Sequence, residues 1–194
     1  IVDRGGYRMA WIGFVEKDEE KTIRPIALKG TEEGYLTLAK VTWSDSPHGM
    51  GPTGMAVKTG LCQINRDFLT NPVMKPWKAE ALRRGYKSSV ALPLKDSAGT
   101  FGVLSIYSAD TEAFDEDEIN FLKDLSADLS FGINALRVRA EHKKAEEAIH
   151  RLAYFDTLTG LPNKIFLLER LEKSMSSLSP GSSVSLLTLD IERF

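Results

Sequence analysis

Residues 1–108 alternate between short apolar runs and polar connections that contain glycine, a pattern typical of a small antiparallel sheet. Runs of aromatic and β-branched residues predict four or five strands, at 7–16, 22–28, 61–65, 88–94 and 101–107. The charged cluster 16–21 separates the first two runs, and Asp96, Ser97 and Gly99 supply a turn between the last two. We therefore expect two hairpins joined by a longer connection.

That connection is rich in glycine and is expected to be mostly loop, with one short helix in its last third. Thr53 is a suitable N-cap for this helix, and Gly60 is a suitable stop. The segment 49–60 is not a phosphate loop, because Met55 and Ala56 stand where such a loop has lysine followed by serine or threonine. The helix start offers free backbone amides to an anionic ligand group, unless it only braces the loop.

Aromatic side chains in loop-rich connections can wall a small-molecule cavity. Trp43, Trp77 and Tyr35 are such residues here, although core packing is the alternative for each. His48, beside the glycine-rich loop, can ligate a haem or a metal, or remain a polar surface residue. The candidate pocket residues are Trp43, His48, Gly51, Thr53, Gly54 and Trp77.

A long helix is predicted from Asp115, because four consecutive acidic residues favour a helix start. Apolar residues recur at coiled-coil spacing, first at Ile119, Leu122, Leu129, Ile133 and Leu136, then with a change of face at Val138, Ala145, Ala148 and Leu152. About 35 helical residues extend about 50 Å, more than a small domain needs for its own cover. We expect a homodimer through this helix; the alternative is a core helix with a solvated charged tail.

Composition restricts the partners and the compartment. Lys and Arg number 25 and Asp and Glu 27, so the net charge of −2 gives no one-signed field for binding nucleic acid. Cys62 is the only cysteine, which excludes an internal disulfide and fits a reducing cytoplasm. No apolar run approaches the roughly 20 residues of a membrane span, so no membrane insertion is expected. Because the chain opens at Ile1 without a signal pattern, we expect a cytoplasmic piece of a longer protein.

Residues 155–194 show a different sequence pattern from the preceding chain. We expect a turn-rich stretch, a helix at 164–178 and an apolar strand at 184–189, which are too few to bury their own apolar faces. The strand delivers Asp190 and then Glu192 at its carboxyl end. Carboxylates in that position suit Mg²⁺ in phosphoryl-transfer sites, and two solvated acids after a strand are the alternative.

Residues 154–163, YFDTLTGLPN, and residues 189–194, LDIERF, carry the most specific likeness in the chain. They resemble the opening motif and the first-strand motif of GGDEF domains, Asp-x-Leu-Thr-Gly-Leu-x-Asn and Leu-Asp-Ile-Asp-x-Phe. The resemblance implies that Asp190 and the backbone carbonyl of Ile191 hold Mg²⁺ in an intact domain, which joins two GTP molecules into cyclic di-GMP. Glu192 departs from the family's second aspartate, and the Gly-Gly-Asp-Glu-Phe loop does not occur in this sequence. We therefore expect no catalytic residue within these 194 residues.

Several earlier stretches are similar, in order, to GAF domains, which are sensory domains found before GGDEF output domains. These stretches are 7–16, 50–60, 76–77, 88–94, 102–108 and 113–118. The resemblance implies an α+β fold, with an antiparallel sheet of five or six strands flanked by helices and a pocket for a small-molecule ligand of unknown identity. It divides the chain into a GAF-like domain at 1–136, whose N-terminal helix is expected to be missing, a signalling helix at 115–154 and the N-terminal fragment of a GGDEF domain at 155–194.

Together these likenesses imply a regulatory module that binds a small molecule and signals through a helical linker to a GGDEF domain in cyclic di-GMP signalling. Two alternatives stay open. The chain is the regulatory half of an active diguanylate cyclase, or it is a dimerisation scaffold whose degenerate GGDEF part controls an EAL phosphodiesterase. An intact Gly-Gly-Asp-Glu-Phe loop elsewhere in the protein favours the cyclase.

Overall fold

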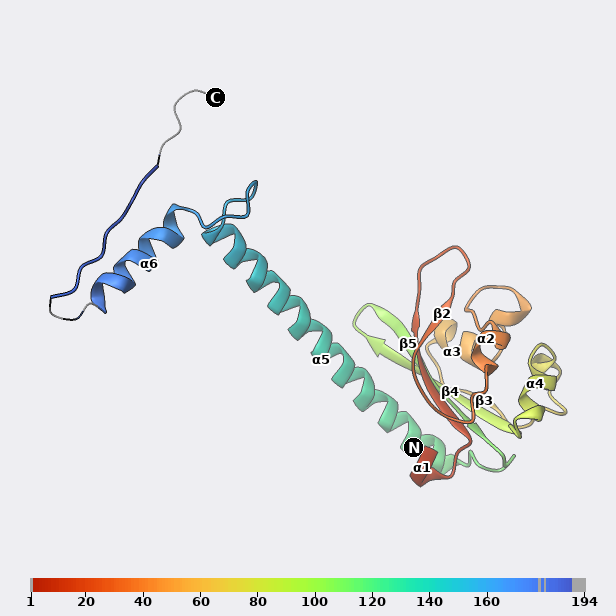
Figure 1. The fold of residues 1–194 in the computed structure, drawn as a ribbon. Helices are drawn as coiled ribbons and strands as arrows, with labels where there is room; N and C mark the ends of the chain where they lie inside the picture. Colours follow the sequence, from red (N-terminus) through yellow and green to blue (C-terminus); the bar gives the residue numbers. More distant parts are fainter. Residues whose placement is uncertain (1, 178, 180, 190–194) are drawn as a thin grey trace. The chain divides into compact units, whose positions relative to one another are not determined.

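The computed structural model describes residues 2–177, 179 and 181–189 (Figure 1). Five strands form one antiparallel sheet in the order β2-β1-β5-β4-β3. Their bounds are β1 Met9–Val15, β2 Ile23–Gly30, β3 Gln63–Asn65, β4 Ser88–Asp96 and β5 Gly99–Ser108. Both expected hairpins are present, β1 with β2 and β4 with β5, and β3 pairs with β4 at the sheet edge. The predicted α+β class is confirmed.

Helices cover both faces of the sheet. Their bounds are α1 Val2–Gly5, α2 Tyr35–Ala39, α3 Pro52–Thr59, α4 Lys78–Arg83, α5 Glu116–Tyr154 and α6 Lys164–Ser176, with short 3-10 turns η1 Pro47–Gly49 and η2 Pro72–Met74. Helices α2, α3 and α4 lie over one face, and the N-terminal half of α5 lies over the other (Figure 1). The chain divides into two compact units, Ile1–Ala135 and Leu136–Phe194. Within the described residues, no helix combines the length and the apolar character needed to cross a membrane.

Side-chain alternation along β5 assigns each residue to one face of the sheet. Ser105 and Tyr107 point to the face beneath α2, α3 and α4, whereas Leu104 and Ile106 point to the face beneath α5. The α5 face is covered mainly by apolar side chains, and Leu122 of α5 is only 1% exposed there. The two faces therefore share the same strands but have separate cores.

Helix α5 starts as predicted, because the side chain of Asp115 accepts a hydrogen bond from the Glu118 amide at 2.8 Å. The first half of the predicted coiled-coil seam is wrong. Ile119 and Leu122 are buried against the chain's own sheet, and Leu129 packs partly buried beside them. The physical reason is that a helix lying on a sheet needs the same three- and four-residue spacing as a coiled coil.

Residues 154–163 form a hydrogen-bonded junction between α5 and α6. The carboxylate of Asp156 accepts hydrogen bonds from the amide and the hydroxyl of Thr159, at 2.8 and 2.7 Å, and these bonds lower the pKa of Asp156. Asn163 caps α6 by accepting from the Phe166 amide, and its side chain donates to the Ala153 carbonyl at 2.7 Å. The motif noted in the sequence therefore ties the end of α5 to the start of α6.

The strand predicted at 184–189 is wrong, because these residues have no regular structure and Leu187 is 82% exposed. A strand needs a neighbour for its backbone hydrogen bonds, and none pairs with this segment in the described part of the chain. The helix predicted at 164–178 is α6, which ends at Ser176. The expected Mg²⁺ ligands, Asp190 and Ile191, lie outside the described residues.

Candidate functional site

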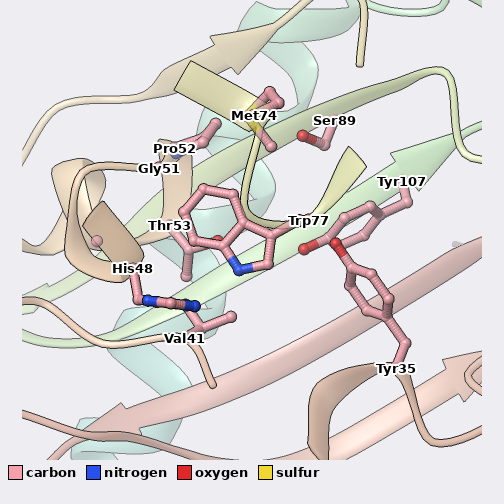
Figure 2. Close-up of a pocket in the computed structure, with 11 residues that line it drawn as sticks. Tyr35, Val41, His48, Gly51, Pro52, Thr53, Met74, Trp77, Ser89 and Tyr107 are labelled. Atoms are coloured by element: carbon pink, nitrogen blue, oxygen red, sulfur yellow. The ribbon is translucent and has the colours of Figure 1, made fainter. Parts of the chain in front are cut away.

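A small cavity lies between the sheet and the helices α2, α3 and α4 (Figure 2). It is lined by Tyr35, Val41, His48, Gly51, Pro52, Thr53, Gly54, Met74, Trp77, Ser89 and Tyr107. The cavity volume is ≈ 20 Å³, which is room for about one water molecule. A ligand larger than water therefore enters only if one of the walls shifts.

Five of the six predicted pocket residues meet at this cavity: His48, Gly51, Thr53, Gly54 and Trp77. The sixth, Trp43, does not line it. The indole N–H of Trp43 donates to the Glu16 carbonyl at 3.0 Å, and the Lys21 ammonium lies 5.0 Å from the ring centroid. Trp43 thus braces the loops beside the first hairpin, and the role of the other five in ligand binding stays a prediction.

The first turn of α3 forms one wall of the cavity. The N-cap of this helix is Gly51 and not Thr53 as predicted, and the predicted stop at Gly60 is confirmed by its left-handed backbone, φ 64°. Glycine is needed at position 51 because a Cβ there would lie 2.6 Å from the Trp77 ring. Thr53 lies inside the first turn, where backbone amides have no intrahelical partner, so this wall presents N–H groups.

Buried hydroxyl groups from both helices and strands lie at or beside the inner end of the cavity. The hydroxyls of Thr53 and Ser105 lie 3.1 Å apart. Figure 2 shows the hydroxyls of Tyr35 and Tyr107 pointing toward one another beside Trp77. Burial raises the pKa of Tyr107, and hydrogen bonding to Trp11, Tyr35 and Thr53 offsets part of that rise. Burial also raises the pKa of Tyr35, so both phenols stay protonated at neutral pH.

The outer wall consists of aromatic rings. The indole N–H of Trp77 donates to the Ala39 carbonyl at 2.8 Å, and the exposed His48 ring lies edge-on to it at 5.9 Å. No Asp, Glu, Lys or Arg side chain lines the cavity. Within the described residues, no group of three or more His, Cys, Asp and Glu side chains gathers to hold a metal ion. The arrangement therefore suits a small molecule held by hydrogen bonds and ring contacts.

Two wall residues, Ser89 and Tyr107, were missed as site residues because they lie within predicted strands. The sequence did hold a signal for them. Ser89, Ser105 and Tyr107 are polar residues in otherwise apolar strands, and Ser105 and Tyr107 are two residues apart and so share a face. Only the strand register shows that Ser89 lies directly opposite Tyr107.

Comparisons with known proteins agree with this fold. Residues 1–134 match the sequence profile of the GAF domain, and residues 153–194 match that of the diguanylate cyclase GGDEF domain. One curated relative, the uncharacterized protein y4lL of Sinorhizobium fredii, is 38% identical over 60 residues, which are 30% of this chain and 7% of that protein. The chain thus spans a small part of the length of this relative.

Solved structures show the same fold. The GAF domain region of a Geobacter sulfurreducens protein has a TM-score of 0.54 at 22% identity, with 66% of this chain and 82% of that chain covered. A domain of a Sinorhizobium meliloti protein described as a two-component sensor histidine kinase has a TM-score of 0.56 at 18% identity, with 71% and 85% covered. The GAF domain of a Coxiella burnetii phosphoenolpyruvate-protein phosphotransferase has a TM-score of 0.53 at 17% identity, with 70% and 76% covered. The chain therefore belongs to the GAF domain family and continues into a partial GGDEF domain.

Proposed function

We propose that the GAF domain senses a small molecule in the cavity beneath α3 and that helix α5 carries the resulting change toward the GGDEF segment. The order of the two matched families along the chain supports this direction, because α5 joins them without a break. The proposed setting is cyclic di-GMP signalling in the cytoplasm, where the single half-buried thiol of Cys62 stays reduced.

The observation that carries the proposal is the sharing of β5 between the cavity and α5. Tyr107 lines the cavity, while its neighbour Ile106 packs in the core beneath α5. Likewise, Ser105 contacts the cavity residue Thr53, while its neighbour Leu104 packs in the core beneath α5. A ligand that shifts the cavity walls moves these strands, and their other face holds the helix. Such a ligand changes the helix only to the extent that it binds one arrangement better than the other.

Native mass spectrometry of the purified chain tests ligand binding, since one spectrum reports the mass of the assembly and of any retained molecule. The proposal predicts a defined extra mass that is lost on denaturation. Ser89→Ala, at the cavity wall, should weaken retention, whereas Ser97→Ala in the exposed β4–β5 turn should not. No retained mass, together with no thermal stabilisation by any compound of a small-molecule panel, contradicts the proposal.

A second proposed activity is homodimerisation through the face of α5 that holds most of the second half of the predicted seam and extends it to Phe131. Phe131, Val138, Ala145 and Leu152 recur every seven residues, and the three large ones are 79%, 59% and 66% exposed. Helical spacing places them on the side of α5 roughly opposite Leu122. A second copy of the chain is the proposed occupant, because a seven-residue apolar repeat matches another helix of the same kind.

Cysteine crosslinking tests this face in a chain whose Cys62 is replaced by serine. Val138→Cys should form a disulfide between two copies on mild oxidation. Leu136→Cys is the matched control, since it lies two residues away and so on nearly the opposite side of the helix. Equal crosslinking of the two variants, or faster crosslinking at position 136, contradicts the proposed face.

The proposed output is a diguanylate cyclase domain in which Asp190 and the Ile191 carbonyl hold Mg²⁺. A degenerate GGDEF part that controls a phosphodiesterase is the alternative. GTP turnover by the protein with its complete GGDEF domain decides between them. Cyclic di-GMP formation that Asp190→Asn abolishes supports the cyclase, and no formation by the unaltered protein supports the alternative.

A further inference from the structure

A groove lies next to the cavity, between α2 and the β1–β2 hairpin. Its volume is ≈ 330 Å³, within the range of small-molecule sites, whereas the cavity alone has room for about one water molecule. Among the described residues, Val41 is the one that lines both spaces, and Figure 2 shows it with the other residues around the cavity. Val41 is therefore a wall that the cavity and the groove share.

The groove has an apolar floor that belongs to the same core as the cavity. Trp11 and Ile23 line the groove and are buried in the cluster that also contains Trp77 and Tyr107. Leu36 of α2 lines the groove as well and packs partly buried against that cluster. The two spaces are thus neighbouring parts of one face of the sheet.

The groove carries one charge of each sign at its rim. Glu20 and Lys40 both line it, both are exposed, and neither has an ion-pair partner among the described residues. The two charges sum to zero, so the groove has no one-signed field to attract an ion. The cavity has no charged side chain in its lining, and a charge buried there would lack a partner. Both spaces therefore favour a molecule without net charge.

The wall at Val41 lies between two fixed points of the backbone. On one side, the Ala39 carbonyl accepts the indole N–H of Trp77 at 2.8 Å. On the other side, the Trp43 amide donates at 2.9 Å to a carbonyl of the β1–β2 connection. Between them Lys40, which ends α2, has a φ of 42°, a left-handed conformation that is unfavourable for a residue with a Cβ. The half-buried Val41 follows this strained residue, so we expect it to be the wall that moves most easily.

We propose that the cavity and the groove become one binding site when the Val41 side chain moves aside, and that this site takes a flat, mainly apolar molecule without net charge and with one hydrogen-bonding end group. The inference rests on the proposed function and names the chemical class of its ligand. The end group reaches the hydroxyls of Thr53 and Tyr107 in the cavity. The apolar body lies in the groove against Trp11 and Leu36.

The three tryptophans of the chain report on this site separately. Trp11 lines the groove, Trp77 lines the cavity, and Trp43 lines neither and donates its indole N–H to the Glu16 carbonyl. The probe is 2-naphthol, a flat apolar molecule with one hydroxyl, added to the ¹⁵N-labelled chain at neutral pH while the indole signals are followed by NMR. We expect the Trp11 and Trp77 signals to shift saturably with one shared dissociation constant, and the Trp43 signal to stay in place.

Charged relatives of the probe test the ligand class. The molecules 2-naphthoate and 2-naphthylmethylammonium keep the ring system but carry a negative and a positive charge. Each should bind about tenfold more weakly than 2-naphthol or worse, because the charge gives up water and finds no partner in the cavity. Equal or tighter binding of either ion overturns the uncharged class.

Variants test the role of the shared wall. Val41→Phe should obstruct the link, weaken 2-naphthol binding about tenfold and remove the shift of the Trp77 signal. Val41→Ala should have the opposite effect and tighten binding, because less of the wall has to move. Val184→Phe is the matched control at a residue that is 42% exposed and lies outside the GAF domain, and it should leave binding unchanged. Opposite effects of the two Val41 variants would not arise from misfolding.

The outcomes separate this inference from the proposed function. A shift of Trp11 without Trp77, or of Trp77 without Trp11, overturns the single site, and so do two different dissociation constants. If 2-naphthol shifts neither signal, the inference is wrong, while a retained mass in native mass spectrometry would still support the proposed function. If no mass is retained and no compound of the panel stabilises the chain either, the proposed function fails as well.

Discussion

The sheet buries two different kinds of surface on its two faces. Beneath α5 it packs aliphatic and aromatic side chains such as Leu92, Ile106 and Leu122 against one another with hardly any exposure. Beneath α2, α3 and α4 it buries hydroxyl groups around a small cavity. The α5 face is covered mainly by apolar packing, whereas the cavity face departs from that pattern where we place the ligand. Such departures concentrate at functional sites.

Backbone contacts show the same contrast. On the cavity face Gly54 packs so closely that a Cβ would lie 2.3 Å from the Gly49 carbonyl oxygen and 2.5 Å from that of Thr42. Gly132 in α5 has open space around it. The cavity face is therefore shaped by close backbone approach, while α5 is held by side-chain burial.

The largest expected effect is on the α5 face. Leu122→Ala should lower the free energy of unfolding by about 2–5 kcal/mol, because it removes a side chain buried in a closed apolar core. Leu136→Ala, the same substitution at a position that is 69% exposed, should change it by less than about 0.5 kcal/mol. Urea denaturation measures both. Similar losses for the two variants would mean that α5 does not pack on the sheet as described.

Replacing glycine by alanine should change the free energy of unfolding in opposite directions on the two faces. Gly54→Ala should destabilise the chain by about 1–3 kcal/mol, since the added methyl meets backbone carbonyls that cannot move aside easily. Gly132→Ala should stabilise it by roughly 0.5–1 kcal/mol, because alanine is the better helix former and meets no neighbour. Thermal or urea unfolding reports both changes, and a stabilising Gly54→Ala would refute the close approach.

Alkaline pH should act on the tyrosines of the cavity face. The pKa of Tyr107 is raised in the folded chain above its ordinary value of 10.0, chiefly by burial, and the unfolded chain lacks that burial. The stabilising contribution is therefore complete below pH 10.0 and declines as the pH rises above it, by about 1.4 kcal/mol per pH unit for each such residue.

Tyr107→Phe tests this pH dependence directly. Urea unfolding at several alkaline pH values should show that the free energy of unfolding falls less steeply with pH in the variant. The difference in slope should be that of one titrating group, about 1.4 kcal/mol per pH unit. An unchanged slope would show that Tyr107 ionises as readily in the folded chain as in the unfolded one.

Much of the fold could be predicted because it depends on local signals. Alternation and turn residues such as Asp96 and Gly99 placed both hairpins, and the acidic start placed α5. Long-range contacts decided the rest. The spacing of Ile119 and Leu122 could not show whether a helix or the chain's own sheet covers them. The apolar run 184–189 could not show whether a partner strand is present.

The candidate site was predicted in its loop part and missed in its strand part. The glycine-rich loop pointed to Gly51 and Gly54 as pocket candidates, and Trp77 signalled an aromatic wall. Ser89 and Tyr107 became visible only when the strand register placed them opposite each other.

Hydrogen–deuterium exchange of Gly51→Ala tests the central claim, that the cavity and α5 are coupled through the strands they share. Alanine fits the backbone at position 51, with φ −72°, but its methyl group would lie 2.6 Å from the Trp77 ring and must displace that wall without any ligand. We predict altered protection of α5 amides within residues 116–135, on the opposite face of the sheet, and no such change in Thr59→Val. Changes confined to α3, α4 and their loops would contradict the account.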